Sequence, residues 1–267
     1  MTKTYHDDLG RVFDRMQLQH GECFDFPIGV ADDETAAFTW RWFSHVEHDG
    51  IGALAQLLGA YGHQLVAPRL RIRPDRRAAW HEHLRPMLRR SYLRAAPRSL
   101  WEVELAEPAS RRLPQEVLEL TEHETRLVAD VARSLSVSVN SLVLWALATA
   151  VRSLAAAPAH RQHWTVPVNM RGAMPETAAN QLSFIRVPIR PGDSPAVIHA
   201  RVYDLLRTGT HWVMLRWIEF FANRATMKFP PVRSTGCLSN LGAYTGTGPA
   251  RIAFSPPCGT PSRSAPA

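Results

Sequence analysis

Residues 35–50, TAAFTWRWFSHVEHDG, pass from an aromatic, strand-like segment into a polar loop. From Phe38 onward the side chains alternate between apolar and polar faces, which is the two-residue period of a β-strand. The loop SHVEHDG interrupts this alternation, and its final glycine allows the backbone to turn. Apolar residues then recur at helical spacing over 51–65. We therefore expect a strand over residues 35–43 with its two tryptophans in the core, a short loop and a helix.

The rest of the chain predicts further helices and strands. Thr121 followed by Glu124 fits a capping box, in which a hydroxyl accepts a free backbone N–H and the glutamate returns to the N–H of the cap. Elements of both kinds interleave, which favours an α/β (α+β) class. Beyond residues 35–65 we expect helices near 12–20, 76–94, 121–134, 138–154, 195–207 and 213–225, and strands over 100–105, 116–120, 163–168, 182–189 and 235–241.

The composition changes at two places along the chain. A stretch rich in proline and arginine, residues 108–114, separates two halves. Residues 246–267 are rich in proline, glycine and serine and poor in core-forming residues, so we expect a disordered tail there. The sequence therefore predicts an N-terminal part over residues 1–112, which carries SHVEHDG, and a C-terminal part over residues 113–245.

Composition also restricts the compartment and the metal chemistry. The 267 residues include three cysteines without C-x-x-C spacing, which argues against a disulfide framework and a structural zinc site. The longest apolar stretch is interrupted by polar residues, so we expect no membrane span. Residues 1–10 lack the apolar core of a secretory signal. We therefore expect a cytoplasmic protein that binds no metal.

Positive charge is concentrated in one block of the sequence. The formal net charge is +7, and ten arginines but only two acidic residues lie between Arg69 and Arg98. Such a block favours anionic partners, such as the phosphates of a nucleotide-bearing cofactor, an acidic carrier protein or a nucleic acid. A solvated, arginine-rich face of a helix is the simpler interpretation of the same block. Charge alone therefore assigns no partner.

The chemistry of the sequence centres on the loop that follows the aromatic strand. His45 lies just after the strand, Asp49 four residues later, and Gly50 where the helix is expected to begin. A loop at the end of a strand is a place where a rigid scaffold presents reactive groups. Imidazole titrates near neutral pH and can accept a proton from an alcohol, amine or thiol. His45 is thus a candidate general base, although the chain contains 12 histidines and a surface-loop role fits the same position.

The pattern H-x-x-x-D-G between an aromatic strand and an apolar helix resembles the HHxxxDG motif of the chloramphenicol-acetyltransferase-like acyltransferases. That superfamily includes peptide-synthetase condensation domains, wax ester synthases and polyketide-associated acyltransferases. His45 falls on the catalytic histidine of the motif, and Asp49 and Gly50 fall on its last two positions. Ser44 replaces the first histidine, which is a departure from the motif.

Two later segments extend the resemblance. Residues 166–171, VPVNMR, and 180–184, NQLSF, resemble a stretch of the second lobe, in which an arginine pairs with the motif aspartate. The resemblance therefore implies an ion pair between Asp49 and Arg171. Residues 239–242, SNLG, resemble the SNxxG stretch of the wax-ester-synthase-like members. The implied fold has two lobes of mixed sheets flanked by helices, shortened here at both ends.

The resemblance implies a cofactor-free acyl transfer. The donor would be a thioester, acyl-CoA or acyl carrier protein, and the acceptor a small alcohol or amine of lipid or secondary metabolism. His45 would deprotonate the acceptor, and Asp49 would shape the loop. We also expect no metal, because no ligand cluster is identifiable in the sequence, and no nucleic-acid partner. Candidates for substrate or oxyanion binding are Ser239, Asn240 and Asn180.

Two other interpretations remain open at this point. The chain is short for the family, which is consistent with a catalytically inactive remnant that keeps part of the fold. The arginine block at residues 69–98 is consistent with a basic nucleic-acid-binding module, although aromatic residues are sparse there and no binding motif is recognisable.

Overall fold

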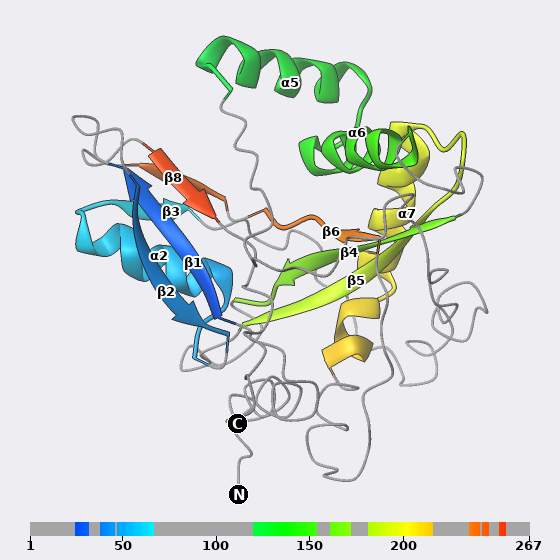
Figure 1. Ribbon diagram of the computed structural model, residues 1–267. Coiled ribbons are helices and arrows are strands. Elements are labelled where there is room, and N and C mark those ends of the chain that lie inside the picture. The colour runs from blue at the N-terminus through cyan, green and yellow to red at the C-terminus, as the bar shows by residue number, and fades with distance from the viewer. Residues whose placement is uncertain are drawn as a thin grey trace, which may run out of the picture.

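In the part of the chain that it describes, the computed structural model contains three small β-sheets and several helices, an α+β arrangement (Figure 1). The expected elements at residues 12–20, 76–94, 100–105 and 116–119, and the later part of 213–225, lie outside the residues that it describes. The structure describes residues 25–31, 38–45, 47–66, 120–153, 161–171, 181–215, 235–240, 242–245 and 251–254.

The first sheet has the order β2-β1-β8 and is antiparallel. Strand β1 (Asp25–Ala31) was not expected from the sequence, whereas β2 (Phe38–Ser44) matches the expected aromatic strand. Helix α2 (Gly50–Ala60) follows β2 and packs its leucines against the sheet. Ile28 of β1 and Leu58 of α2 are completely buried in this core. The sheet and α2 together hold the loop that carries His45.

The two tryptophans of β2 are solvent-exposed, so the expectation that they lie in the core is wrong. Trp40 is 41% exposed and Trp42 is 53% exposed. On the other face of the same strand, Phe43 packs against the core that α2 covers. Helix α2 thus covers one face of the sheet, and alternation along the strand places the tryptophans on the opposite face. The sequence pattern identified the two faces but not which one is covered.

Part of the expected tail forms a strand instead. Strand β8 (Arg251–Phe254) pairs antiparallel with β1, which corrects the expectation that the whole of residues 246–267 is disordered. Strand β7 (Ala243–Thr245) likewise pairs with β3 (Gln64–Val66). The first two residues of β3 belong to the predicted helix over 51–65, which ends earlier than expected. Strands β7 and β8 are short, and each pairs with a strand that is far away in the sequence. The local composition therefore did not predict either of them.

The other three-stranded sheet, called the second sheet below, has the order β5-β4-β6. Strands β4 (Gln162–Asn169) and β5 (Leu182–Ile189) form an antiparallel pair, and β6 (Gly236–Cys237) is parallel to β4. Helices α6 (Val139–Ser153) and α7 (Pro195–Arg207) contribute to its core. The core also contains buried polar groups, and the Gln162 amide, for example, donates to the carbonyl of Ala148 on α6 at 2.9 Å.

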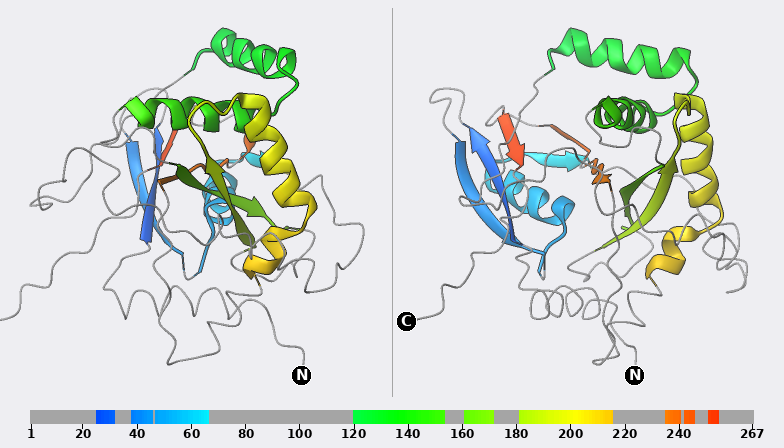
Figure 2. Two further views of the ribbon diagram at one scale, coloured as in Figure 1. Left: turned by 90° about the vertical axis from the view of Figure 1, so that its right-hand side faces the viewer. Right: turned by 45° about the vertical axis from the view of Figure 1, so that its right-hand side comes forward.

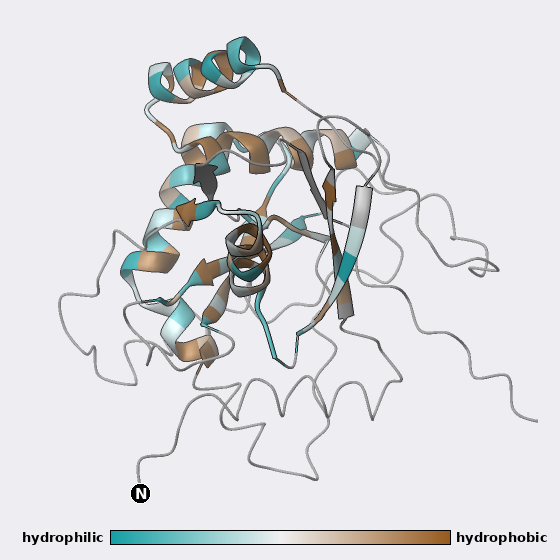
Figure 3. Cartoon of the chain, turned by 90° about the vertical axis from the view of Figure 1, so that its left-hand side faces the viewer, coloured by the Kyte–Doolittle hydropathy of each residue, from teal (hydrophilic) through white to brown (hydrophobic). Residues whose placement is uncertain are grey.

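Helix α5 (Glu122–Ser134) lies beyond α6, away from the two three-stranded sheets (Figures 1 and 2). It begins with the predicted capping box: the Glu124 N–H donates to the Thr121 hydroxyl at 3.2 Å, and the Thr121 N–H donates to the Glu124 carboxylate at 2.8 Å. Its surface mixes hydrophilic and hydrophobic residues (Figure 3), and Leu127 and Val131 remain exposed. Ala132 is its buried residue.

A single helix needs about 20 consecutive, mostly apolar residues to cross a bilayer. None of them is by itself both long and apolar enough to cross a bilayer. Helices α5 and α6 meet the length and composition criteria only as a pair, and that pair is bent by 98°.

Candidate functional site

Asp49 caps the N-terminus of α2. Its side chain accepts a hydrogen bond from the backbone N–H of Gly52 at 2.7 Å, and its carbonyl accepts from Ala53 at 2.9 Å. The first N–H groups of a helix have no partner within the helix, so an aspartate at this position stabilises the start of the helix. The cap fixes the end of the SHVEHDG loop and leaves Asp49 only 1% exposed.

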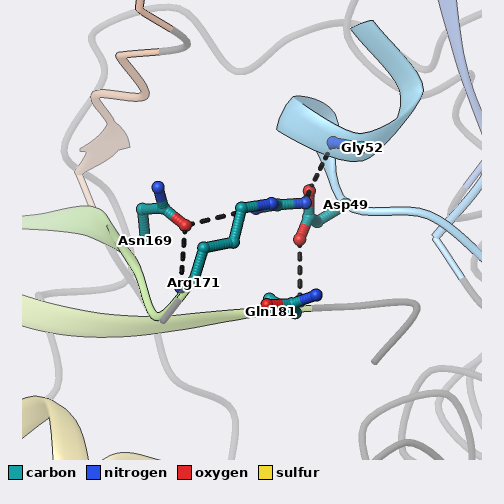
Figure 4. Close-up of polar contacts among 5 residues, drawn as sticks. All are labelled: Asp49, Gly52, Asn169, Arg171 and Gln181. Atoms are coloured by element: carbon teal, nitrogen blue, oxygen red, sulfur yellow. Dashed lines mark hydrogen bonds and ion pairs between the residues drawn. The ribbon is translucent and has the colours of Figure 1, made fainter. Parts of the chain in front are cut away.

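The same carboxylate joins the start of α2 to the neighbouring ends of β4 and β5 (Figure 4). Arg171 Nη2 donates to Asp49 Oδ1 at 2.8 Å, and the backbone N–H of Gln181 donates to Oδ2 at 2.7 Å. Asn169 Oδ1 in turn accepts from the Arg171 backbone N–H at 3.1 Å and from Nη1 at 3.2 Å. The ion pair implied by the resemblance is therefore present. The bond from Gln181 was not foreseen.

His45 lies in the turn between β2 and α2 and is half-buried. Its ring centroid is 4.3 Å from that of Phe26 on β1, with the two planes tilted by 36°. His48, in the same loop, meets Phe43 edge-on at 5.8 Å. The aromatic contacts orient both imidazoles against the first sheet.

A cavity of about 570 Å³ lies beside Asp49. Gly50 at the start of α2 lines it together with residues of α6, α7, β4, β5 and the segment after β6. Some of its lining residues are apolar and buried, among them Leu144 and Ile185, whereas the α5–α6 turn contributes exposed polar residues. His45 is not among the lining residues. The structure thus brings the motif aspartate and glycine to the cavity wall but places the histidine outside that wall.

The other expected site residues have separate positions. Ser239 and Asn240 both line the cavity and are exposed. Asn240 Nδ2 donates to Asn140 Oδ1 at 2.8 Å, while Asn240 Oδ1 accepts from the backbone N–H of Gly242 at 2.8 Å. These bonds fix the Asn240 amide, but its role in oxyanion binding stays a prediction. Asn180 lies outside the described residues.

Sequence reasoning missed a second polar cluster on the cavity wall. Ser138 and Ser141, at the start of α6, contact Nδ1 of His199 on α7. All three residues line the cavity. The contacts join residues 61 and 58 positions apart, so the only signal in the sequence was the location of a histidine on the amphipathic helix over 195–207.

The charge of the cavity wall is low. Asp49 is the one acidic residue among the described lining residues, which include no lysine or arginine, and its carboxylate is paired with Arg171. The described residues also hold no group of three or more histidine, cysteine, aspartate or glutamate side chains placed to bind a metal ion. The cavity wall therefore offers apolar surface and neutral hydrogen-bonding groups.

No protein-family model matches the chain, and no curated protein matches it in sequence. Its fold is similar to the solved structure of polyketide synthase associated protein 5 from Mycobacterium tuberculosis, with a TM-score of 0.51 at 18% sequence identity. The similarity covers 85% of this chain and 64% of that one. The chain thus spans less than two thirds of the length of that relative, and the likeness at this identity is one of fold.

Proposed function

We propose that this protein is an acyltransferase that moves an acyl group from a thioester to an alcohol or amine, with His45 as the general base. The proposal includes a two-lobed architecture of the chloramphenicol-acetyltransferase-like kind. The donor would be acyl-CoA or an acyl carrier protein. The name of the structural neighbour favours an acceptor or acyl group related to polyketides.

The observation that carries the proposal is the position of Asp49. Four residues after His45, this carboxylate is 1% exposed and receives hydrogen bonds from Gly52, Arg171 and Gln181. A carboxylate held by several donors fixes the loop around it, which is what the motif aspartate is expected to do. The arrangement supports a structural role for Asp49 and leaves proton transfer to His45.

The proposed reaction needs no acyl-enzyme. The His45 imidazole takes the proton of the acceptor hydroxyl or amine as the acceptor oxygen or nitrogen attacks the thioester carbonyl. The tetrahedral intermediate then collapses, the carbon–sulfur bond breaks, and the thiolate leaves and receives the proton. Ser239 and Asn240, on the cavity wall, are candidates to donate to the oxyanion. The products are an ester or amide and a free thiol.

One observation favours a second candidate, a binding protein without transfer activity. His45 contacts Phe26 and does not line the cavity beside Asp49, so the base and this cavity are separate in this structure. A protein of this kind would retain the cavity and the Asp49–Arg171 ion pair but catalyse no transfer. The third candidate, nucleic-acid binding through residues 69–98, concerns residues outside the described ranges.

The test is release of free thiol from a panel of acyl-CoA and acyl carrier protein donors in the presence of mixed alcohols and amines. We expect acceptor-dependent release by the wild type and a fall of about 100-fold or more in His45→Ala, since a general base contributes roughly 10²–10⁴ to the rate. His48→Ala is the matched control, because it removes a second imidazole of the same loop.

The outcomes separate the candidates. Equal loss of activity in both variants would point to damage to the loop and would remove His45 as the base. A folded wild type that releases no thiol from either donor class would contradict the acyltransferase proposal and favour the binding protein. Circular dichroism of each variant checks that the fold is retained.

A further inference from the structure

His199 accepts two hydrogen bonds at the same ring nitrogen. The backbone N–H of Ser138 lies 3.3 Å from Nδ1, and the hydroxyl of Ser141 lies 3.2 Å from the same atom. The Ser138 hydroxyl is 2.8 Å from that of Ser141, and the Ser141 N–H donates to the Ser138 hydroxyl at 3.2 Å. The ring also contacts Tyr203, with a centroid distance of 5.0 Å. Two helices and the α5–α6 turn thus hold the imidazole in place.

This pattern determines where the imidazole proton lies. A backbone N–H can only donate, so Nδ1 of His199 must be an acceptor and carries no proton. The Ser141 hydroxyl then also donates to Nδ1, and it can accept from the hydroxyl of Ser138. The single proton of the neutral ring is therefore on Nε2. Nε2 makes no hydrogen bond with the described residues and is not enclosed by them.

The surroundings of His199 are those of a site for an uncharged ligand. Beside it on α7, Val202 and Leu206 line the cavity, and Leu144 of α6 and Ile185 of β5 close it with buried apolar surface. A volume of about 570 Å³ falls within the range of small-molecule sites, which combine apolar walls with a few polar groups that fix orientation. The carboxylate of Asp49, the one acidic residue among the described lining residues, is already paired with Arg171, so a charged ligand would find no unpaired counter-charge on this wall.

We propose that this cavity binds an uncharged, mostly apolar molecule that carries a carbonyl or ether oxygen, and that the Nε2–H of His199 donates to that oxygen. The hydrogen bonds at Nδ1 pre-orient the ring and keep the donor on the free nitrogen, so binding requires no change of tautomer. The proposal concerns binding alone and does not depend on acyl transfer by His45.

Two substitutions distinguish the role of Nδ1 of His199 from the role of Nε2. In His199→Asn, the amide oxygen can replace Nδ1 as an acceptor for Ser138, but the Nε2 donor is lost. In His199→Gln, the longer side chain places an amide N–H near the position of Nε2, while the acceptor at Nδ1 is lost. The first variant therefore tests ligand recognition, and the second tests the contact with the α5–α6 turn.

The probes are butyrophenone and butylbenzene, which differ only by a ketone oxygen in place of two hydrogens. Dissociation constants are measured by calorimetry on the full chain without any thioester. We expect His199→Asn to weaken the binding of butyrophenone about five- to tenfold, which is the effect of losing one hydrogen bond. The dissociation constant of butylbenzene should be unchanged. His199→Gln should bind butyrophenone within about twofold of the wild type. Nitrogen-15 spectra should place the imidazole proton on Nε2.

Three results would overturn the proposal. One is an equal loss of affinity for both probes in His199→Asn, because the effect would then not involve the ketone. Another is a proton on Nδ1 in the spectra. The third is binding that survives Val202→Trp in a folded protein, since this substitution fills the cavity and any remaining site lies elsewhere. None of these results bears on thiol release, so failure here and failure of the acyltransferase proposal are distinguishable.

Discussion

Two shielded aspartates of this protein pair with arginines over very different distances along the chain. Asp49 is bound by Arg171 and by the N–H of Gln181, which are 122 and 132 residues away, and its side chain is 1% exposed. Asp193 is bound by Arg201 and by the N–H of Arg190, which are 8 and 3 residues away, and its side chain is 11% exposed. The chemistry is the same, but the first pair connects the loop after His45 to the second sheet, and the second fixes one turn between β5 and α7.

The comparison predicts that Asp49→Ala has the largest effect on stability. The change removes a helix cap and leaves the Arg171 guanidinium and the Gln181 N–H without their acceptor, so the free energy of unfolding should fall by about 3–5 kcal/mol. Urea unfolding measures the change. Arg171→Met should lower the free energy of unfolding much less in the Asp49→Ala variant than in the wild type. Additive effects of the two substitutions would show that the ion pair is not what joins the two sheets.

Asp193→Asn should have a smaller, pH-dependent effect. Burial acts to raise the pKa of Asp193, but the hydrogen bonds from Arg201 and Arg190 and their charges outweigh it, and the pKa is lowered overall. A lowered pKa contributes stability that is complete above the ordinary carboxyl value of about 4 and is lost as pH falls through the folded-state pKa. We expect the Asp193→Asn substitution to cost about 1–2 kcal/mol at pH 7 and progressively less below about pH 4.

Thermal unfolding between pH 2.5 and 7 tests this expectation. Asp204→Asn is a suitable control, because Asp204 pairs with Arg207 at 3.1 Å on an exposed helix surface. An equal loss of stability for Asp193→Asn at pH 3 and pH 7 would contradict the assigned pKa direction.

Glu124→Gln should have the smallest effect of the three. The backbone N–H and hydroxyl of Thr121 lower the pKa of Glu124, but this carboxylate is fully exposed to water. We expect faster amide exchange at Thr121 and in the first turn of α5, with global unfolding nearly unchanged, because only one end of one helix frays. If Glu124→Gln lowered the free energy of unfolding as much as Asp193→Asn does, α5 would be coupled to the rest of the fold more strongly than its few buried residues indicate.

The sequence predicted the second sheet better than the first. Strand β5 and helix α7 have the predicted bounds, and the capping box at Thr121 was correct, because periodicity and capping are local properties. Strand β1, DFPIGVA, was missed because proline and glycine weaken a strand pattern. What makes it a strand is its pairing with β2 and β8, which no local pattern shows.

The candidate site was predictable only in part for the same reason. The resemblance identified the partner of Asp49, and the structure contains that ion pair. No local pattern indicated that Gln181 would donate its backbone N–H to the same carboxylate, or that His199 would lie against Ser138. These contacts depend on how α6, α7 and the two sheets pack.

The pairing of β8 with β1 has a consequence for folding order. Ile28 is one of the first described residues and Phe254 the last, and they face each other across the first sheet. During synthesis β1 and β2 emerge from the ribosome long before β8 exists, so β1 must remain available as an edge until β8 has been synthesised. Closing so long a loop is entropically costly and slow, and we expect completion of this sheet to be a late event in folding.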